Sequence, residues 1–433
     1  MDMIVTPSTF SQTVEIPPSK SHTIRMILLA TLARGSSCII RPLQSLDASS
    51  CLNAAKKLGA SIQEKPDENG ALESIYIKGI GGAKNFLPQE EPIDVGNSGT
   101  TLFLFLSAAA LGDKKITFTG DAQIKNRDAG PLLEALKKFG ATVESDKGST
   151  PISIRGPWKG GKASIRCMIS QYLSSILIAA PLAPKGCVTE VDVNLLNEKP
   201  YVEMTIKYLQ NQGIIFENDS FNFFRIPGGQ SYKPFSEQTP ADFSSAAFPA
   251  LATVVSGGTS ILRGLDRRDS QGDKAFFEII QKMGCSVTWR QKGEWWEVEV
   301  SGRKEALRGG VFDLNDTPDL LPAVCVLGAF AKGETRIVNT AHARNKETDR
   351  ISVMSQELMR AGVFCQEEPD GITIRGTGGH VKGAVFNGHK DHRIVMALSC
   401  LARGAEGAST IQGTEAVNVT YPGFMDLIGG AAL

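Results

Sequence analysis

The sequence predicts an α/β protein in which two domains each contain three copies of one structural repeat. Three observations support this prediction. The chain has 433 residues, more than one hydrophobic core usually fills, so two domains of roughly 200 residues are expected. Glycine-ended helices recur along the chain at nearly constant intervals. The segment Pro-Phe-Ser-Glu-Gln-Thr-Pro at 234–240 interrupts this pattern between the third and fourth copies.

Two glycine motifs define the repeat. In the first motif, an apolar and often alanine-rich helix ends near a glycine, and a β-prone run follows. These glycines are 71 to 77 residues apart, at Gly35, Gly112, Gly186, Gly257, Gly333 and Gly404. We expect them to close their helices in the left-handed conformation. In the second motif, an amphipathic helix ends in glycine before a short strand, at Gly59, Gly140, Gly213, Gly284, Gly362 and, in shortened form, Gly429. Each repeat of about 70 residues then carries two helices and several strands.

The domain boundaries follow from this repeat. The sixth copy is cut short after Tyr421-Pro422, so we expect the first strand of the chain to complete it. The predicted C-terminal domain is therefore discontinuous and consists of residues 1–18 and 240–433. The N-terminal domain spans residues 19–239. Crossings near 18–20 and 234–242 predict a hinge beside a cleft.

Composition excludes several classes of protein. Lysine plus arginine and aspartate plus glutamate number 46 each, so no overall charge would attract nucleic acid or an anionic membrane surface. An anionic ligand must therefore be bound by a local cluster. The eight cysteines lie far apart without a C-x-x-C pair, which indicates reduced residues. No signal sequence and no apolar run of membrane-spanning length is present, so we expect a cytoplasmic protein.

Three helix starts in the N-terminal half have the composition of ligand sites. In segment 17–25, Lys20, Ser21 and Arg25 would converge where free backbone N–H groups already attract phosphate. The glycine-rich turn 94–101 permits close backbone approach to a ligand, although it lacks the lysine of a nucleotide P-loop. Segment 170–175 offers hydroxyl and amide groups suited to a polyol. All three are also compatible with ordinary polar helix caps.

The C-terminal half contains three further polar helix starts. Asp319 precedes an apolar helix, either as a helix-stabilising charge or as a general base. Segment 345–350, Asn-Lys-Glu-Thr-Asp-Arg, follows a strand and precedes an amphipathic helix. By itself it fits a functional loop and a solvated helix start capped by Thr348 or Asp349 equally well. Segment 389–393 contains two histidines without further His or Cys ligands nearby, so no metal site is predicted.

Taken in order, these segments resemble the 5-enolpyruvylshikimate-3-phosphate synthase family of enolpyruvyl transferases. The resemblance covers nearly the whole chain. It rests on Pro-Ser-Lys-Ser with Arg25, Gly-Asn-Ser-Gly-Thr at 96–100, Ser-Gln-Tyr at 170–172, Glu-Lys-Pro-Tyr at 198–201, Gln-Gly-Asp at 271–273, Pro-Asp at 318–319, segment 345–350 and Asp-His-Arg at 391–393. The fold that it implies is a two-domain inside-out α/β barrel with three βαβαββ repeats per domain and an active-site cleft between the domains.

The resemblance also implies a reaction and the residues that perform it. The enolpyruvyl group of phosphoenolpyruvate would pass to the 5-hydroxyl of shikimate 3-phosphate with release of phosphate, a step of aromatic amino acid biosynthesis that uses no metal or other cofactor. Asp319 would take the hydroxyl proton, and Glu347 and Lys20 would exchange protons with the methylene carbon. Arg350 and Arg393 would hold the carboxylate of phosphoenolpyruvate in bidentate fashion.

The implied ligand contacts form two overlapping sets. The residues implied to bind shikimate 3-phosphate are Lys20, Ser21, Arg25, Ser170, Gln171, Tyr201, Asp319, His342 and Lys346. Those implied to bind phosphoenolpyruvate are Lys20, Asn97, Gly99, Gln123, Gln171, Arg350 and Arg393.

The chain departs from the family pattern at six positions. Gln123 and Val419 stand where an arginine and a lysine for the phosphate of phosphoenolpyruvate are usual, and Phe103 replaces an arginine after the glycine-rich turn. In the phosphoshikimate site, serine, serine and asparagine are common at the positions of Ile169, Glu198 and His342. Losing two charged hydrogen bonds would weaken phosphoenolpyruvate binding by roughly 10² to 10⁴ unless another cation compensates. The nearby cations in the sequence are Lys125, Arg127, Arg344 and Lys390.

Two alternative functions are left open by the sequence. A related enolpyruvyl transferase that acts on a UDP-sugar would share the fold, but its catalytic loop carries a cysteine, and none lies near Gln123. A diverged member that binds a phosphorylated cyclitol without transferring enolpyruvate would fit the missing cations at positions 123 and 419. Calorimetry would separate this binder from the enzyme, since the binder should form no ternary complex with phosphoenolpyruvate. We expect a monomer that binds small molecules only.

Overall fold

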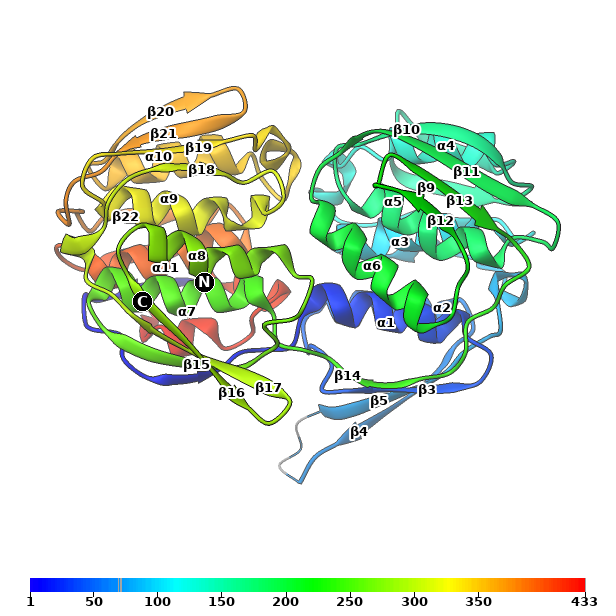
Figure 1. The fold of residues 1–433 in the computed structure, drawn as a ribbon, viewed down its shortest axis with the longest axis horizontal. Helices are drawn as coiled ribbons and strands as arrows, with labels where there is room; N and C mark the ends of the chain where they lie inside the picture. Colours follow the sequence, from blue (N-terminus) through cyan, green and yellow to red (C-terminus); the bar gives the residue numbers. More distant parts are fainter. Residues whose placement is uncertain (69, 71, 433) are drawn as a thin grey trace. The chain divides into compact units, whose positions relative to one another are not determined.

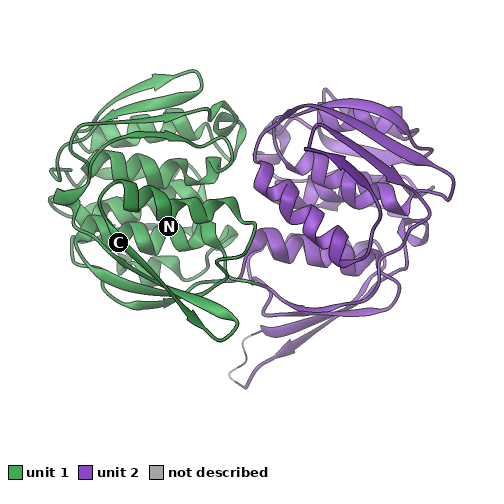
Figure 2. Cartoon of the chain, viewed as in Figure 1, with its two compact units in different colours: residues 1–17, 240–433 green, residues 18–239 purple. Residues whose placement is uncertain are grey.

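The computed structural model (Figure 1) describes residues 1–68, 70 and 72–432. It divides the chain into two compact units (Figure 2): unit 1 contains Met1–Pro17 and Pro240–Leu433, and unit 2 contains Pro18–Thr239. The chain therefore passes from one unit to the other twice, at Pro17–Pro18 and at Thr239–Pro240. The hinge expected near these crossings stays a prediction.

Unit 2 consists of three βαβαββ repeats. The first contains β14 (Ser236–Gln238), α1 (Lys20–Leu32), β3 (Ser36–Ile40), α2 (Leu46–Lys57), β4 (Ser61–Pro66) and β5 (Leu72–Lys78). The second contains β6 (Ile93–Asp94), α3 (Gly99–Ala109), β7 (Ile116–Thr119), α4 (Gly130–Lys138), β8 (Thr142–Asp146) and β9 (Ser149–Arg155). The third contains β10 (Gly161–Cys167), α5 (Gln171–Ala179), β11 (Val188–Leu196), α6 (Lys199–Asn211), β12 (Glu217–Asp219) and β13 (Phe223–Pro227).

Unit 1 repeats the same order of elements. The fourth repeat contains β2 (Thr13–Glu15), α7 (Phe243–Ser256), β15 (Thr259–Leu265), α8 (Ala275–Lys282), β16 (Ser286–Lys292) and β17 (Trp295–Ser301). The fifth contains β18 (Val311–Asp313), α9 (Leu321–Phe330), β19 (Glu334–Val338), α10 (Arg350–Arg360), β20 (Phe364–Glu368) and β21 (Gly371–Arg375). The sixth contains β22 (Val385–Asn387), α11 (His392–Gly404), β23 (Ser409–Gln412), α12 (Phe424–Leu427), β24 (Gly430–Ala432) and β1 (Asp2–Val5).

Each repeat forms one four-stranded sheet, and all six sheets share one pairing pattern. In the second repeat, for example, β6 and β7 are parallel, whereas β7 with β9 and β8 with β9 are antiparallel. The first strand of the chain, β1, pairs with β23, with Met3 opposite Ile411. It completes the sixth repeat, as the shortened sequence of that repeat predicted. The six-fold repeat and the βαβαββ order are therefore confirmed.

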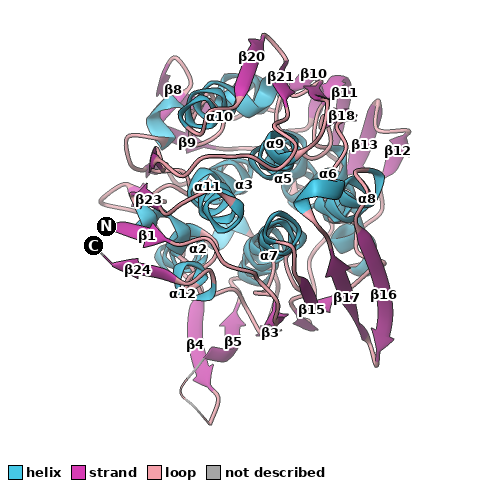
Figure 3. Cartoon of the chain, turned by 90° about the vertical axis from the view of Figure 1, so that its left-hand side faces the viewer, coloured by secondary structure: helices cyan, strands magenta, loops and turns pink. Residues whose placement is uncertain are grey.

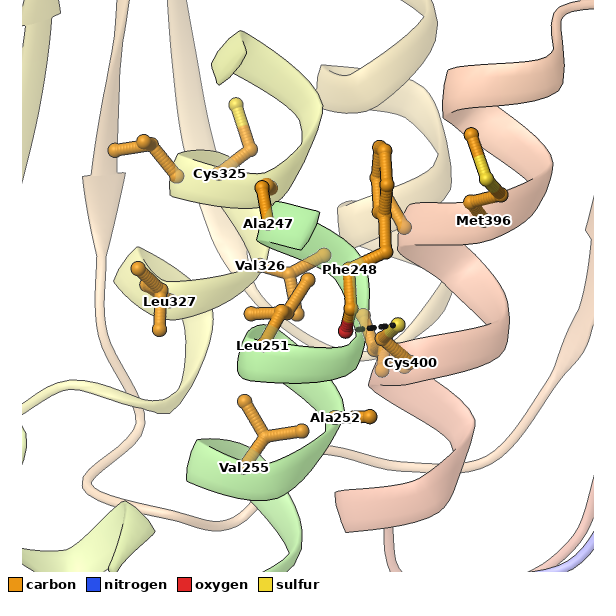
Figure 4. Close-up of a cluster of buried hydrophobic side chains, with 14 of the residues drawn as sticks. Ala247, Phe248, Leu251, Ala252, Val255, Cys325, Val326, Leu327, Met396 and Cys400 are labelled. Atoms are coloured by element: carbon orange, nitrogen blue, oxygen red, sulfur yellow. Dashed lines mark hydrogen bonds between the residues drawn. The ribbon is translucent and has the colours of Figure 1, made fainter. Parts of the chain in front are cut away.

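The first helix of each repeat lies inside its unit, and the sheets lie outside. Every residue of α3 and α9 is buried, because both helices are apolar on all faces and an all-round apolar helix must be covered on all sides. Figure 3 shows α7, α9 and α11 of unit 1 surrounded by strands. Figure 4 shows where these three helices meet: the Cys400 thiol donates to the Phe248 carbonyl at 3.2 Å, among apolar side chains of all three. All eight cysteines are free, and six of them are buried.

The glycines of the first motif do not all close helices as expected. Gly257 does so, with a left-handed φ of 79°. Gly404 instead lies within α11, where a Cβ would collide with the backbone carbonyl of Val255. Its role is therefore close helix packing. The left-handed closures belong mainly to the second motif, whose glycines all have positive φ, at Gly59, Gly140, Gly213, Gly284, Gly362 and Gly429. Within the part of the chain that the structure describes, no helix is long and apolar enough to cross a membrane.

Candidate active site

Most of the predicted site residues lie at or near helix N-termini, some in unit 1 and others in unit 2. In unit 1 they belong to the starts of α9, α10 and α11, and in unit 2 to the starts of α1, α3, α5 and α6. Free backbone N–H groups at such ends favour negative charge. Each unit therefore contains several helix starts that suit anionic ligands.

Arg350 is the centre of the group in unit 1. Its guanidinium donates through Nη1 to Asp319 Oδ1 at 2.7 Å and through Nη2 to Glu347 Oε2 at 2.6 Å. It also donates to both carboxylate oxygens of Asp391, from Nε at 2.8 Å and from Nη2 at 3.2 Å. Only 1% of the Arg350 side chain is exposed. A guanidinium has five N–H donors. Among the described residues, these bonds use four of them, which leaves one Nη1 donor for a ligand.

Asp319 connects the two arginines that the sequence analysis assigned to the substrate carboxylate. It lies in the short 3₁₀ helix η6 (Pro318–Leu320). Its Oδ2 accepts from Arg393 Nη2 at 2.8 Å, and Lys346 Nζ lies 4.0 Å from Oδ1. Burial acts to raise the pKa of Asp319, but Arg393, Lys346 and Arg350 together hold this pKa well below its usual range. Asp319 is therefore ionised at neutral pH, with both oxygens held in fixed directions.

The unit 1 cluster balances its charges internally. Burial acts to lower the pKa of Arg350, but Asp391, Glu347 and Asp319 raise it. The cluster contains three carboxylates and three cations: Asp319, Glu347, Asp391, Lys346, Arg350 and Arg393. Buried charges are stable only when they are paired in this way. An entering anion would therefore compete with carboxylates of the protein for the same cations.

The 345–350 segment is a structured helix start. Asp349 is the N-cap of α10, and its Oδ1 accepts from the Ser352 backbone N–H at 3.1 Å. This confirms one of the two predicted caps. Arg344 donates to Asp349 at 2.7 Å and to Glu367 at 2.8 Å. The donors of Arg344 therefore hold this loop together, and the compensating role that the sequence allowed for Arg344 stays a prediction.

Asp391 and Arg393 are positioned by the start of α11. Asp391 is the N-cap, and its Oδ1 accepts from the Arg393 backbone N–H at 2.9 Å. In the preceding turn, His389 and Lys390 have positive φ values of 51° and 58°. The carboxylate of Glu357, on α10, is fully buried and holds this turn, with Oε1 3.0 Å from His389 Nε2. His389 therefore helps to place Asp391 and Arg393.

His342 is buried, with 2% of the residue exposed, and its Nε2 lies 3.1 Å from the Asn315 carbonyl oxygen. This contact joins the loop before α10 to the loop that leads into Asp319. The binding role implied for His342 stays a prediction.

Asp273 is a further buried carboxyl group, and its pKa responds to the charge of Asp319. It is 1% exposed and accepts a hydrogen bond from Ser244 Oγ, at the start of α7. Burial and the charge of Asp319 raise the pKa of Asp273 to about 7, against the lowering effect of Arg393. Because the folded pKa exceeds the unfolded value, the folded state binds more protons between about pH 4 and 7. The contribution of Asp273 to stability therefore falls as the pH rises through this range.

We expect Asp273→Asn to remove this loss. At pH 8 the variant should be more stable than the parent by about 1 to 3 kcal/mol, because asparagine has no charge to bury, and at pH 5 the two should differ little. Denaturant unfolding at both pH values measures the difference. Asp370→Asn, at an exposed turn, is the control and should show no such pH dependence. A variant that is less stable than the parent at pH 8 would contradict the expectation.

In unit 2, Lys20 is held by a carboxylate that the sequence analysis did not assign. Lys20 is the first residue of α1, and its Nζ lies 3.2 Å from Asp47 Oδ2. Asp47 is in the first turn of α2, after the N-cap Ser45. The two side chains are 15% and 5% exposed. This ion pair restricts the position of the Lys20 ammonium group.

Arg25 is buried between α1 and α6. Its Nε donates to Thr205 Oγ1 at 2.8 Å, its Nη2 to the Tyr201 carbonyl at 3.1 Å and its Nη1 to the Ser21 carbonyl at 3.0 Å. Burial lowers the pKa of Arg25 to about 10, so it stays charged at neutral pH. Among the described residues, its hydrogen bonds go only to neutral oxygens. Its charge therefore favours an anion nearby.

The start of α5 is occupied by Glu198. The backbone N–H and the hydroxyl of Ser170 both donate to Glu198 Oε2, at 3.0 and 2.8 Å. Ser170 is 0% and Glu198 is 1% exposed. The hydroxyl that the sequence analysis assigned to the substrate is thus bound to a carboxylate of the protein. The neighbouring Gln171 has a buried Oε1 without a hydrogen-bond partner among the described residues, so it can accept from a ligand.

The cation at the glycine-rich turn is Arg127. A Cβ at residue 99 would collide with the Arg127 guanidinium, so Gly99 is what lets this arginine reach the start of α3. Gln123 accepts a hydrogen bond from the Asn97 side chain and thereby fixes the turn. Arg127 is one of the four nearby cations that the sequence analysis named, and its guanidinium lies against Gly99.

Phe103 and Tyr172 support the segment that carries Arg127. Phe103 packs edge-to-face on Tyr172, with ring centroids 5.3 Å apart. The Tyr172 hydroxyl donates to the carbonyl oxygen of Asp128, the residue after Arg127. Phe103 therefore contributes core packing where the family pattern has a charge. Val419, the other departure, is half-buried at the end of the 3₁₀ helix η8 (Thr414–Val419).

Comparisons with known proteins identify relatives of this chain. The family model described as EPSP synthase (3-phosphoshikimate 1-carboxyvinyltransferase) matches residues 4–428. A 3-phosphoshikimate 1-carboxyvinyltransferase from Ruminiclostridium cellulolyticum is 44% identical over 432 residues, which cover 99% of this chain and 98% of that protein. One from Acetivibrio thermocellus is 45% identical over 420 residues, covering 96% and 95%. A solved EPSP synthase from Acinetobacter baumannii has a TM-score of 0.79 and 26% identity, covering 99% of this chain and 97% of that one.

Proposed function

We infer that this chain, which belongs to the EPSP synthase family, transfers the enolpyruvyl group of phosphoenolpyruvate to the 5-hydroxyl of shikimate 3-phosphate and releases phosphate. It is therefore a transferase of the shikimate pathway. The family match and the two relatives, which are named for this activity and align over almost the full length, do not favour the UDP-sugar transferase or the non-catalytic binder.

The observation that carries the mechanism is the neutral cluster around Arg350. An addition of a hydroxyl across an enol needs a base for the hydroxyl, an acid for the methylene carbon and cations for the carboxylate. Unit 1 holds carboxylates for the two proton steps and cations for the substrate carboxylate within one hydrogen-bonded set. We assign the base to Asp319, the proton exchange at carbon to Glu347 and the carboxylate contact to Arg350 and Arg393.

The hydrogen bonds of Arg350 limit how it can bind the carboxylate of phosphoenolpyruvate. Arg350 has only one N–H donor outside its bonds to Asp319, Glu347 and Asp391. A bidentate contact by Arg350 alone would therefore break one of those bonds. We propose that Arg350 gives one donor and that Arg393 supplies the other.

Unit 2 provides the remaining substrate contacts. We assign Lys20, Ser21, Arg25, Ser170, Gln171 and Tyr201 to shikimate 3-phosphate, together with Lys346 and His342 of unit 1. Arg127, Asn97 and Gly99 are assigned to phosphoenolpyruvate, with Arg127 taking the role expected at Gln123. Free cysteines support a reducing compartment such as the cytoplasm, and the monomeric state stays a prediction.

A phosphate-release assay with both substrates tests the function. We expect release that requires phosphoenolpyruvate and shikimate 3-phosphate together, with the enolpyruvyl product detected by mass spectrometry. Binding of shikimate 3-phosphate without any release of phosphate would instead support the non-catalytic binder.

Arg127→Ala should raise the KM for phosphoenolpyruvate by about 10- to 100-fold, because a charged hydrogen bond is worth about 1.5 to 3 kcal/mol. The KM for shikimate 3-phosphate should change little. Lys125→Ala is the matched control, since Lys125 is an exposed cation two residues away in the same 3₁₀ turn, η2 (Ile124–Asn126). If the two variants behaved alike in steady-state kinetics, Arg127 would not be the cation in question.

A further inference from the structure

Glu198 places a negative charge among the donors that an anionic substrate would use. Its Oε2 accepts from both the backbone N–H and the hydroxyl of Ser170, at the start of α5. Its charge also acts on the buried guanidinium of Arg25, which is hydrogen-bonded only to neutral oxygens among the described residues. A serine hydroxyl, a helix N-terminus and an arginine together form a site for an anion. In this structure the anion is a side chain of the protein.

The conformation of Glu198 shows that this contact is not an ordinary helix cap. Glu198 is the N-cap of α6, yet its side chain makes no capping bond to that helix. Its φ is 56°, a left-handed value that is unfavourable for glutamate. The carboxylate reaches across to α5 instead, and the two bonds to Ser170 offset the unfavourable backbone conformation. The contact therefore holds α5 and α6 together through a buried charge.

We propose that Glu198 is an internal anion that occupies the phosphate subsite of the acceptor and sets how strongly the protein prefers a phosphorylated acceptor. This inference rests on the proposed function, which assigns Ser170 and Arg25 to shikimate 3-phosphate. The phosphate group must displace the carboxylate from Ser170 before it can use the same donors. Two like charges near one set of donors repel each other, so the displacement weakens binding of the phosphorylated acceptor. An acceptor without phosphate has no phosphate group that must displace the carboxylate from Ser170.

Calorimetric titration of two ligands into four proteins tests the proposal. The ligands are shikimate 3-phosphate and shikimate. The proteins are the parent, Glu198→Gln, Glu198→Ser and the control Glu203→Ser, which removes an exposed charge from the same helix. We expect both position-198 variants to bind shikimate 3-phosphate about tenfold more tightly, or better, because a close like charge is removed. Shikimate binding should stay within about twofold, and Glu203→Ser should match the parent.

Three outcomes would overturn the proposal. Shikimate 3-phosphate affinity that is unchanged or weaker in both variants, with thermal stability intact, would show that Glu198 does not obstruct the phosphate. Equal tightening of both ligands would show an effect through the fold rather than through charge. If none of the four proteins bound shikimate 3-phosphate, the proposed phosphate subsite would not exist. By contrast, tighter binding of shikimate 3-phosphate without phosphate release from phosphoenolpyruvate would support the proposal while the proposed function failed.

Discussion

Replacing Asp319 with asparagine should lower kcat by about 10² to 10⁴, the range typical for loss of a positioned general base. Asparagine keeps the size of the side chain and one acceptor oxygen for Arg350 or Arg393. It cannot take the proton of the attacking hydroxyl. The variant also leaves two carboxylates against three cations in the cluster, so affinity for the anionic phosphoenolpyruvate should not fall. The expected signature is therefore a large loss of kcat with an unchanged or lower KM for phosphoenolpyruvate.

Asp313→Asn is the matched control for this experiment. Asp313 lies at the end of β18, and its carboxylate accepts from the Asn315 backbone N–H at 2.9 Å and from Asn339 Nδ2 at 2.6 Å. It supports the loop before Asp319 without contacting Arg350 or Arg393. We expect its kcat within about threefold of the parent, since an asparagine oxygen can replace one of these acceptors. Similar losses in both variants would mean that Asp319 acts through the loop and not as a base.

The sequence predicted the repeat well because each copy needs the same physical signals. A buried helix must be apolar on all faces, and a helix end before a strand needs a residue that tolerates positive φ. These demands recur six times, so their spacing was visible without any structure. The role of Gly404 was not visible, because close packing against the Val255 carbonyl depends on a contact between residues far apart in sequence.

The sequence predicted which segments form the candidate site better than it predicted which residues pair with each other there. Asp349 was a foreseeable N-cap because capping is local. The carboxylates that hold Lys20 and Arg350, Asp47 and Asp391, come from other helices. Apart from the family motif at 391–393, their sequence signal is an acidic residue at a helix start, which is common. Arg127 was one of several nearby cations, and only its place against Gly99 distinguishes it from Lys125.

Replacing Arg350 with methionine should destabilise unit 1 by about 3 to 5 kcal/mol, because it leaves buried carboxylates without their cation. Arg350 is 1% exposed and is bonded to Asp319, Glu347 and Asp391. Arg344→Met is the matched control on the same loop. Arg344 also pairs with two carboxylates, but its side chain is 23% exposed. Its loss should cost about 1 kcal/mol, as expected of partly solvated pairs. Chemical denaturation of both variants measures the difference.

The pH dependence and a double variant separate uncompensated charge from lost packing. Arg350 helps to lower the pKa of Asp319, so without Arg350 the folded variant binds protons more readily as the pH falls and regains stability. The destabilisation by Arg350→Met should therefore be smaller at pH 5 than at pH 8. Adding Asp391→Asn should recover more than about 1 kcal/mol at pH 8, because it removes one of the unpaired charges. Equal destabilisation at both pH values, with no recovery in the double variant, would show that Arg350 acts mainly through its packed volume. The charge balance of the cluster would then not be what holds the start of α10 in place.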